Sequence, residues 1–178
     1  MILLVNGPNL NLLGEREPQV YGSTTLAEIE RMVADTCAAY GVEVRAIQSS
    51  YEGALIDFLQ EHRGEASGVI INPGALTHSS YALHDCLKAL SCPVIEVHIS
   101  NIQAREEWRR GDVVSPATTG QIVGLGPYGY YLAALWHCQR VAGSALSTAQ
   151  MNEAGAEELD VEPPEEIPMV GGRGEYEG

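Results

Sequence analysis

Five consecutive residues decide the fold class of this chain: Gly68-Val69-Ile70-Ile71-Asn72. The residues between the glycine and the asparagine are all apolar, so a strand here has apolar side chains on both of its faces. Strands of this kind lie inside parallel sheets that helices cover on both sides. The stretch therefore predicts a doubly wound α/β fold.

Four more apolar runs alternate with helical patterns on either side of this stretch. The alternation predicts a five-stranded parallel sheet with crossover helices on both faces. The first helix has the clearest ends, because Thr25 and Glu28 match a capping box and Gly41 matches a C-terminal stop. We expect strands at 2–6, 42–48, 69–72, 94–98 and 121–125, and helices at 26–40, 54–62, from 79 or 80 to 90, and at 128–146.

The negative charge is concentrated at the C-terminal end. The chain has 178 residues and a net charge of −14, and residues 149–178 hold nine acidic residues and one Arg. Glu, Pro and Gly dominate this segment, so it buries too little apolar surface to offset its ordering entropy. We expect a catalytic domain at residues 1–147 and an acidic, disordered tail at 148–178.

Composition argues against several classes of partner. An acidic body without a Lys/Arg run is unsuited to nucleic acid or anionic membranes and favours a small-molecule ligand. The chain has no positively charged leader and no apolar run near the roughly 20 residues that span a bilayer, so we expect the cytoplasm. The four cysteines form no Cys-x-x-Cys pair and are expected to be reduced: Cys37, Cys86, Cys92 and Cys138.

Polar side chains follow three of the expected strands. The first strand leads to a glycine-rich loop with Asn9, Arg16 and Tyr21, the third to 72–78, and the fourth to 98–101. Ligands of doubly wound folds bind beyond the carboxyl ends of the strands, where such loops meet. We therefore expect these three segments to converge on one site.

Arg16 and Tyr21 together suit a catalytic base. A phenol with a pKa of about 10 is a poor base at neutral pH, but a neighbouring guanidinium favours the phenolate, which can take a proton next to a carbonyl. Alternatively, Tyr21 anchors the loop and Arg16 is solvated. The length and glycines of the loop also suit a lid that closes over a substrate.

Glu96 and His98 suit a catalytic acid. They lie two residues apart on a strand, so both point to one face and the carboxylate can orient or charge the imidazole. The alternative is a buried core pair without a chemical role. Their position at the ligand-facing end of the strand favours the first interpretation.

The neighbouring segments offer groups that can hold an anionic substrate. The helix that begins after 72–78 presents backbone N–H groups suited to a carboxylate. The arginines after the fourth strand can clamp a substrate or form ion pairs with nearby glutamates: Arg105, Arg109 and Arg110. Asp85, a lone acid on the expected helix, would ordinarily be a solvated charge.

A glycine motif supports a rival function. Residues 124–129 (GLGPYG) fit G-x-G-x-x-G between a strand and a helix, as in a dinucleotide-dependent oxidoreductase. The full fingerprint needs a further strand and an acidic residue about 20 positions on, and Pro127 removes an N–H donor. Close helix–sheet packing explains Gly124–Gly129 more simply. The histidines form no H-x-x-x-H pair and no Cys/His cluster, so no metal is expected.

With these segments in place, the chain resembles the type II 3-dehydroquinate dehydratases from about Ile2 to Gly143. Four motifs carry the resemblance: N-G-P-N-L-N-L-L-G-x-R-E-P-x-x-Y-G at 6–22, N-P-G-A-x-T-H at 72–78, E-V-H-I-S-N at 96–101 and A-R-E-E-W-R at 104–109. The resemblance implies a flavodoxin-like fold, no cofactor or metal, and a homododecamer built from trimers. It also implies anti elimination of water from 3-dehydroquinate through an enolate, giving 3-dehydroshikimate in the shikimate pathway to chorismate and aromatic amino acids.

The resemblance further implies a role for each matching residue. Tyr21 removes the C2 proton with Arg16 activating it, His98 paired with Glu96 protonates the leaving hydroxyl, and Asn9 helps hold a water against the enolate oxygen. Asp85 is implied to reach a neighbouring subunit's site, and two residues bind through backbone amides. The implied substrate-binding set is Asn72, His78, Asp85, Ile99, Ser100 and Arg109.

Some features depart from the family pattern. Leu76 stands where many relatives carry Tyr, and Ser50-Tyr51-Glu52 replaces a sequence that contains Asn, so lid contacts can differ. The tail has no counterpart, and a third hypothesis is a non-catalytic binding module that acts through it. Biosynthesis and quinate breakdown are both compatible with these residues.

Overall fold

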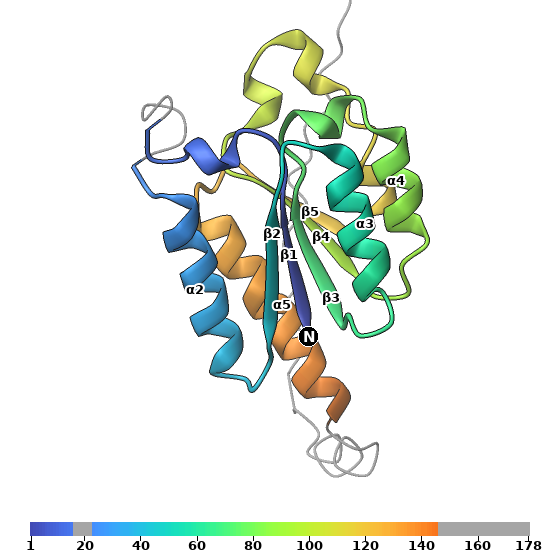
Figure 1. Ribbon diagram of the computed structural model, residues 1–178. Coiled ribbons are helices and arrows are strands. Elements are labelled where there is room, and N and C mark those ends of the chain that lie inside the picture. The colour runs from blue at the N-terminus through green and yellow to red at the C-terminus, as the bar shows by residue number, and fades with distance from the viewer. Residues whose placement is uncertain (16–22, 146–178) are drawn as a thin grey trace, which may run out of the picture. The chain divides into compact units, whose positions relative to one another are not determined.

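The computed structural model describes residues 1–15 and 23–145. Its centre is a sheet of parallel strands in the order β2-β1-β3-β4-β5 (Figure 1). β1 pairs with β2 on one side and with β3 on the other, so the order of the strands reverses next to β1. Such a reversal is the topological switch point of a doubly wound fold. The strands are β1 (Ile2–Asn6), β2 (Val44–Gln48), β3 (Gly68–Asn72), β4 (Val94–His98) and β5 (Gly120–Val123).

Two of the helices begin at capping residues that are visible in the sequence. The hydroxyl of Thr25 accepts the backbone N–H of Glu28, and the Glu28 carboxylate accepts the N–H of Thr25, which forms the predicted capping box. Ser80 caps α4 in a similar way. The α-helices of the described chain are α2 (Leu26–Ala38), α3 (Glu52–His62), α4 (Tyr81–Lys88) and α5 (Tyr128–Ala145). Its 3-10 helices are η1 (Leu10–Leu12), η2 (Gly74–His78), η3 (Ile102–Ala104), η4 (Glu107–Arg110) and η5 (Ser115–Ala117).

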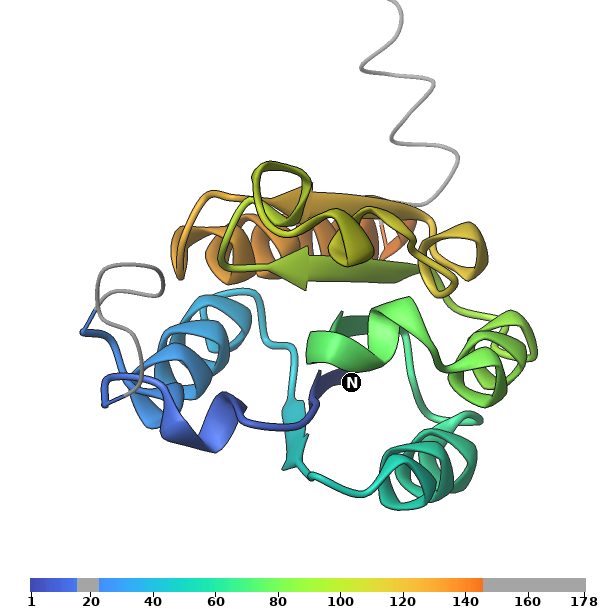
Figure 2. The same ribbon diagram turned by 90° about the horizontal axis from the view of Figure 1, so that it is seen from above.

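The helices form one layer on each face of the sheet (Figure 2). α2 and α5 pack over a core that includes Ile70, whereas α3 and α4 pack over a core that includes Val69 and Ile71. Alternate residues of β3 therefore belong to opposite cores. Every residue of β3 is buried, and with the helices on both faces of the sheet this confirms the doubly wound α/β fold predicted from this stretch. The strand order confirms the flavodoxin-like fold that the resemblance implies.

The ends of several elements differ from the sequence prediction. α2 ends at Ala38 rather than Tyr40, and Gly41 follows with φ 68°, a conformation that glycine adopts without strain. β2 consequently begins at Val44, and β5 ends at Val123 because Gly124 turns away with φ 84°. The sequence prediction contains none of the 3-10 helices, since a single turn leaves no hydrophobic period to detect.

Residues Met1–Ala145 form one compact unit. The predicted tail at 148–178 lies outside the described residues, and the predicted boundary at 147 stays a prediction. All four cysteines are free, and the three on helices are buried. Within 1–15 and 23–145, no helix combines the length and the apolar character that crossing a membrane requires.

Candidate active site

A cleft opens beyond the carboxyl ends of β1, β3 and β4, at the switch point of the sheet. The loops after these strands meet there, which confirms the predicted convergence for the described residues. Two arginines from the segment between β4 and β5 complete the wall. The lining residues are Pro8, Asn9, Leu10, Leu12, Leu13, Asn72, Gly74, Ala75, His78, His98, Ile99, Ser100, Ile102, Arg105 and Arg109.

The loops after β1 and β3 pack directly on each other. The N–H of Gly7 donates to the carbonyl of Asn72 over 2.8 Å. A Cβ at Gly7 would lie 2.4 Å from the carbonyl oxygen of Pro73, closer than real Cβ atoms approach an oxygen. Glycine is therefore required at this position, and the two loops hold the base of the cleft in one arrangement.

Asn9 adopts a left-handed backbone conformation, with φ 68°, immediately before η1. Among the described residues other than glycine, it alone has a positive φ. Asn tolerates this conformation better than most side chains, and strained backbone of this kind clusters at functional sites. The Asn9 side chain is exposed at the cleft. The resemblance implies that it helps to hold a water there, and that role stays a prediction.

Glu96 and His98 contact each other at the end of β4, as their spacing predicts. Nε2 of His98 lies 2.8 Å from Oε1 of Glu96. The Glu96 side chain is fully buried and the His98 side chain is 5% exposed, so solvent screens the contact little. Because Nε2 is engaged, Nδ1 is the ring nitrogen left to face a ligand. An imidazolium held in one orientation by a buried carboxylate can act as a general acid.

Glu96 has further partners in a buried network. Its Oε1 lies 2.6 Å from Oγ1 of Thr77, and its Oε2 accepts an N–H of the Gln121 amide over 2.8 Å. The same two side chains contact Asp112. Burial acts to raise the pKa of Asp112, but hydrogen bonds, led by that from the Ser115 backbone, outweigh burial and hold this pKa below its ordinary value.

The amide of Asn72 is oriented by its own loop and by Tyr130 on α5. Its Oδ1 accepts the N–H of Gly74 over 3.1 Å, and its Nδ2 donates to the hydroxyl of Tyr130 on α5 over 2.9 Å. That hydroxyl in turn donates to Oδ1 of Asn6 over 2.9 Å. Burial raises the pKa of Tyr130, so the hydroxyl keeps its proton. The second N–H of Asn72 is then available to the cleft.

Two arginines reach the cleft from the segment above the sheet (Figure 1). Oε2 of Glu106 lies 2.8 Å from Nε of Arg109 and 3.4 Å from Nε of Arg105. Each of the two arginines therefore pairs with Glu106 and also lines the cleft. The sequence presented these two interpretations as alternatives.

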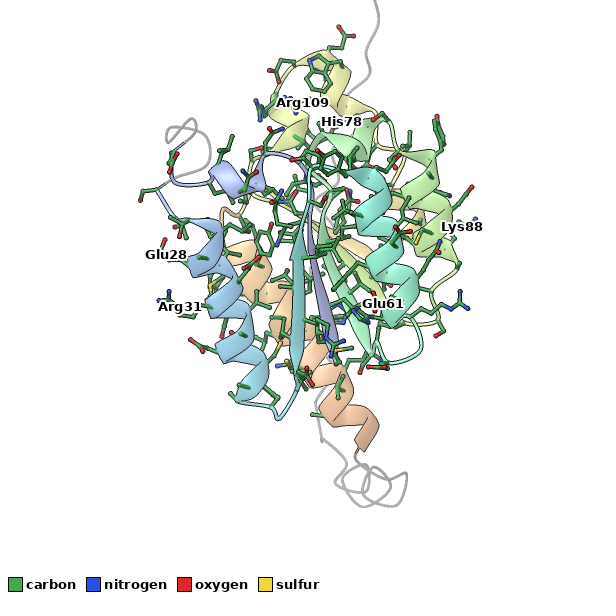
Figure 3. The ribbon with its side chains drawn as sticks, in the orientation of Figure 1. Glu28, Arg31, Glu61, His78, Lys88 and Arg109 are labelled. Carbon is green, nitrogen blue, oxygen red and sulfur yellow. The ribbon has the colours of Figure 1, made fainter. Side chains whose placement is uncertain are left out.

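His78 enters the cleft from η2. Its Nδ1 lies 2.5 Å from the carbonyl oxygen of Gly111, and its ring meets Trp108 edge-on with the centroids 5.4 Å apart. Figure 3 shows His78 and Arg109 together above the sheet, whereas the other labelled side chains lie on outer helix surfaces. The two residues thus form one polar end of the cleft.

Four predicted site residues are not placed in the wall of this cleft. Glu96 is fully buried and contacts His98, but it is not itself part of the cleft wall. Arg16 and Tyr21 lie outside the described residues, so their roles stay predictions. Asp85 lies on α4 with an exposed side chain and does not line the cleft of its own chain. The described residues include the predicted acid pair and the other residues predicted to bind the substrate, and their roles stay predictions.

The glycines of the rival dinucleotide motif have structural explanations. Gly124 and Gly126 have φ values of 84° and 61°, where other residues are strained. A Cβ at Gly129 would lie 3.2 Å from side-chain atoms of Ile122 and of Val97. Close packing of α5 on the sheet therefore explains Gly129.

One group of potential metal ligands occurs among the described residues. Glu96, His98 and Asp112 offer ligand atoms within 4.8 Å of one another. N–H and O–H groups of Gln121 and Thr77 already point at these carboxylates, and such donors disfavour a cation in the same place. The group is better explained as a hydrogen-bond network.

Sequence reasoning did not single out Asp112, Gln121 or Tyr130. Asp112 and Gln121 lie outside any motif and reach Glu96 only through the folding of the chain between β4 and β5. Tyr130 is separated from Asn6 by 124 positions. Thr77 could have been found from the sequence, because it lies within the motif at 72–78.

Fold and cleft together define a class of protein: a flavodoxin-like α/β protein with a buried carboxylate–histidine pair, amides and arginines at its switch point. This composition suits acid–base chemistry on a small anion. Residues 1–138 match the family model described as dehydroquinase class II. The chain belongs to that family.

Individual relatives show the same similarity. The chain is 56% identical over 135 residues to a 3-dehydroquinate dehydratase from Roseiflexus castenholzii, covering 76% of this chain and 86% of the relative. It is 52% identical over 132 residues to a catabolic 3-dehydroquinase from Penicillium rubens, covering 74% and 85%. A crystal structure of a type II dehydroquinase from Butyrivibrio crossotus matches with a TM-score of 0.74 and 46% identity, covering 76% of this chain and 95% of that chain.

Proposed function

We propose that this protein is a 3-dehydroquinate dehydratase, a hydro-lyase that converts 3-dehydroquinate to 3-dehydroshikimate in the shikimate pathway. Family membership and the names of relatives more than half identical to the chain support this activity. One structural observation carries the proposal: the buried Glu96–His98 pair at the switch-point cleft. It supplies the oriented acid that loss of a hydroxyl group requires.

The reaction divides into two proton transfers. The Tyr21 phenolate, stabilised by Arg16, takes the C2 proton, and the electrons of the C–H bond move to the ketone oxygen to form an enolate. Asn9 holds a water against that oxygen. The enolate then restores the carbonyl while the C–O bond to the hydroxyl breaks. His98 protonates the departing oxygen, which leaves as water on the opposite face from Tyr21.

The remaining residues hold the substrate. The available N–H of Asn72 suits a substrate hydroxyl, and Arg109 and His78 form a polar end of the cleft suited to further hydroxyls. Backbone amides of Ile99 and Ser100 are assigned to the carboxylate. These assignments are supported by the position of all five residues in the cleft wall.

Assembly is part of the proposal. The exposed position of Asp85, away from the cleft of its own chain, is what a residue that serves a neighbouring subunit's site requires. We assign the protein a homododecamer that consists of four trimers. We also assign it to the cytoplasm. The acid, the base and the oxyanion-stabilising groups are all protein groups, so the chemistry requires neither a cofactor nor a metal.

The test is direct. Purified protein is incubated with 3-dehydroquinate, and the ultraviolet absorbance of the conjugated enone product is followed with and without EDTA. We expect product formation at the same rate in both samples. Absence of product would refute the proposal, and a rate that falls on chelation would refute the metal-free mechanism. In a parallel fluorescence titration, tight NADH or NADPH binding would favour the oxidoreductase alternative at Gly124–Gly129.

A further inference from the structure

Two carboxyl groups face each other behind the catalytic histidine. Thr77 Oγ1 lies 2.6 Å from Oε1 of Glu96 and 2.8 Å from Oδ1 of Asp112. Gln121 Nε2 lies 2.8 Å from Oε2 of Glu96 and 2.6 Å from Oδ2 of Asp112. A hydroxyl and an amide thus each connect the same pair of carboxyl groups.

The number of protons in this arrangement can be counted. The amide of Gln121 has two N–H groups and satisfies one oxygen of each carboxyl group. The hydroxyl of Thr77 has a single proton, yet it contacts two acceptor oxygens. The hydroxyl can donate to only one of the two carboxyl oxygens. If both carboxyl groups were ionised, the other oxygen would face the lone pairs of the hydroxyl with no proton between them, so one carboxyl group must carry a proton. The pair therefore holds one proton and one negative charge.

We propose that Glu96 and Asp112 share one proton through the hydroxyl of Thr77, and that Asp112 is thereby a positioning residue that sets the acid strength of His98. The inference rests on the proposed function. If Glu96 carried a full charge 2.8 Å from Nε2, it would hold the imidazolium strongly and make His98 a weak acid. Sharing the proton reduces that charge, so His98 gives up its proton more readily.

The geometry around Asp112 places most of the charge on Asp112. Its Oδ1 also accepts the backbone N–H groups of Val114 and Ser115, over 3.0 and 2.9 Å. These donors favour an ionised Asp112, and its pKa is held low accordingly. Glu96, with His98 on one side and Thr77 on the other, is left as the carboxyl group that holds the shared proton.

Other charged or titratable groups, around the cleft or next to Asp112 in the chain, come from three neighbouring segments. His78 on η2 and the Arg105 and Arg109 side chains line the same cleft. Glu106 pairs with both arginines, and His84 on α4 contacts the carbonyl of Val113. All of these groups are left unchanged by a substitution at Asp112, so a change in the titration of His98 reports on the shared proton.

Asp112→Ser tests the inference, with Asp35→Ser on the exposed face of α2 as the control for loss of one charge. Serine keeps a hydroxyl suited to capping the backbone N–H groups of η5, but removes the carboxyl group. Glu96 then becomes fully ionised. We expect the pKa of His98, measured by NMR on histidine-labelled protein, to rise by about one unit, which is a tenfold change in its proton affinity. The alkaline limb of kcat/KM for 3-dehydroquinate should move up equally, and Asp35→Ser should leave both unchanged.

The outcomes separate this inference from the proposed function. An unchanged or lowered pKa of His98 in Asp112→Ser would overturn the shared proton, even if the wild type turns over 3-dehydroquinate normally. Absence of turnover in the wild type would overturn the function, while the NMR titration still decides the shared proton. Thr77→Ser keeps the hydroxyl, so the pKa of His98 should stay at its wild-type value. If the pKa of His98 rose as much in Thr77→Ser as in Asp112→Ser, altered packing would explain both changes and the shared proton would be overturned.

Discussion

At the scale of single residues, the proposed reaction needs two side chains in uncommon protonation states. His98 must be protonated and Tyr21 ionised at the same pH, although a free imidazole and a free phenol tend to the opposite states at neutral pH. For His98, the partner in the structure is the carboxyl group of Glu96, which is buried and lies 2.8 Å from Nε2 of the ring. For Tyr21, the sequence assigns stabilisation of the phenolate to Arg16.

Tyr21→Phe is predicted to lower kcat by a factor of about a hundred or more, the usual contribution of a general base, with little change in KM. The aromatic ring remains, and only the hydroxyl that acts in the transition state is lost. Steady-state kinetics with 3-dehydroquinate measure both constants. Tyr40→Phe, beyond the end of α2, is the matched control. A near-normal kcat for Tyr21→Phe would remove Tyr21 from the mechanism.

At the scale of elements, α5 connects the site to the opposite end of the sheet. Near its start, Tyr130 orients Asn72. Two turns later, His137 packs over the start of β3, where a Cβ on Gly68 would lie 2.2 Å from its Nδ1. Nε2 of His137 contacts the carbonyl of Val69 over 3.0 Å, and Nδ1 has no partner among the described residues. The imidazole therefore folds into the core in its neutral form.

Acid should unfold the protein partly through His137. Burial lowers its pKa from 6.5 to about 4, against the weaker opposing effect of the Val69 carbonyl. The unfolded state therefore binds more protons between these values. The contribution of neutral His137 to the free energy of unfolding is fully present above pH 6.5. It is lost as the pH falls toward 4, by a total of about 3 kcal/mol.

Urea unfolding at pH 7 and pH 5 measures this effect. We expect the free energy of unfolding to fall more in the wild type than in His137→Gln, whose amide can still donate to Val69 and does not titrate. Equal losses in the two proteins would show that other groups cause the acid sensitivity.

At the scale of the whole molecule, the compact unit Met1–Ala145 contains every described residue of the cleft. The family match ends at residue 138. The acidic segment therefore lies beyond the family match in the sequence. We predict that catalysis and the proposed assembly depend on the first 147 residues.

Removal of residues 149–178 is predicted to leave kcat, KM and subunit number unchanged. The ultraviolet assay measures turnover, and sedimentation equilibrium measures mass, for which we expect twelve subunits in both forms. Loss of turnover on truncation would contradict the two-part organisation. A partner protein lost together with the tail would instead support the binding-module hypothesis for this segment.

Features that depend on neighbours in the sequence were predictable. Local spacing sets three such features. Alternation along a strand places Glu96 and His98 on one face and gives β3 apolar side chains on both faces. The capping box at Thr25 depends on a spacing of three residues at the start of a helix. Element ends shifted by one or two residues, and single-residue conformations at Gly41 and Gly124 decide two of them.

The sequence by itself determined the fold class, the edge of the sheet where the site lies, and the acid pair, because strand alternation and motif order encode them locally. Only the tertiary structure decided that Asp112 and Gln121 surround Glu96 and that Tyr130 orients Asn72. These contacts join residues far apart in the chain. They depend on how loops and helices pack in three dimensions, and no local period records that packing.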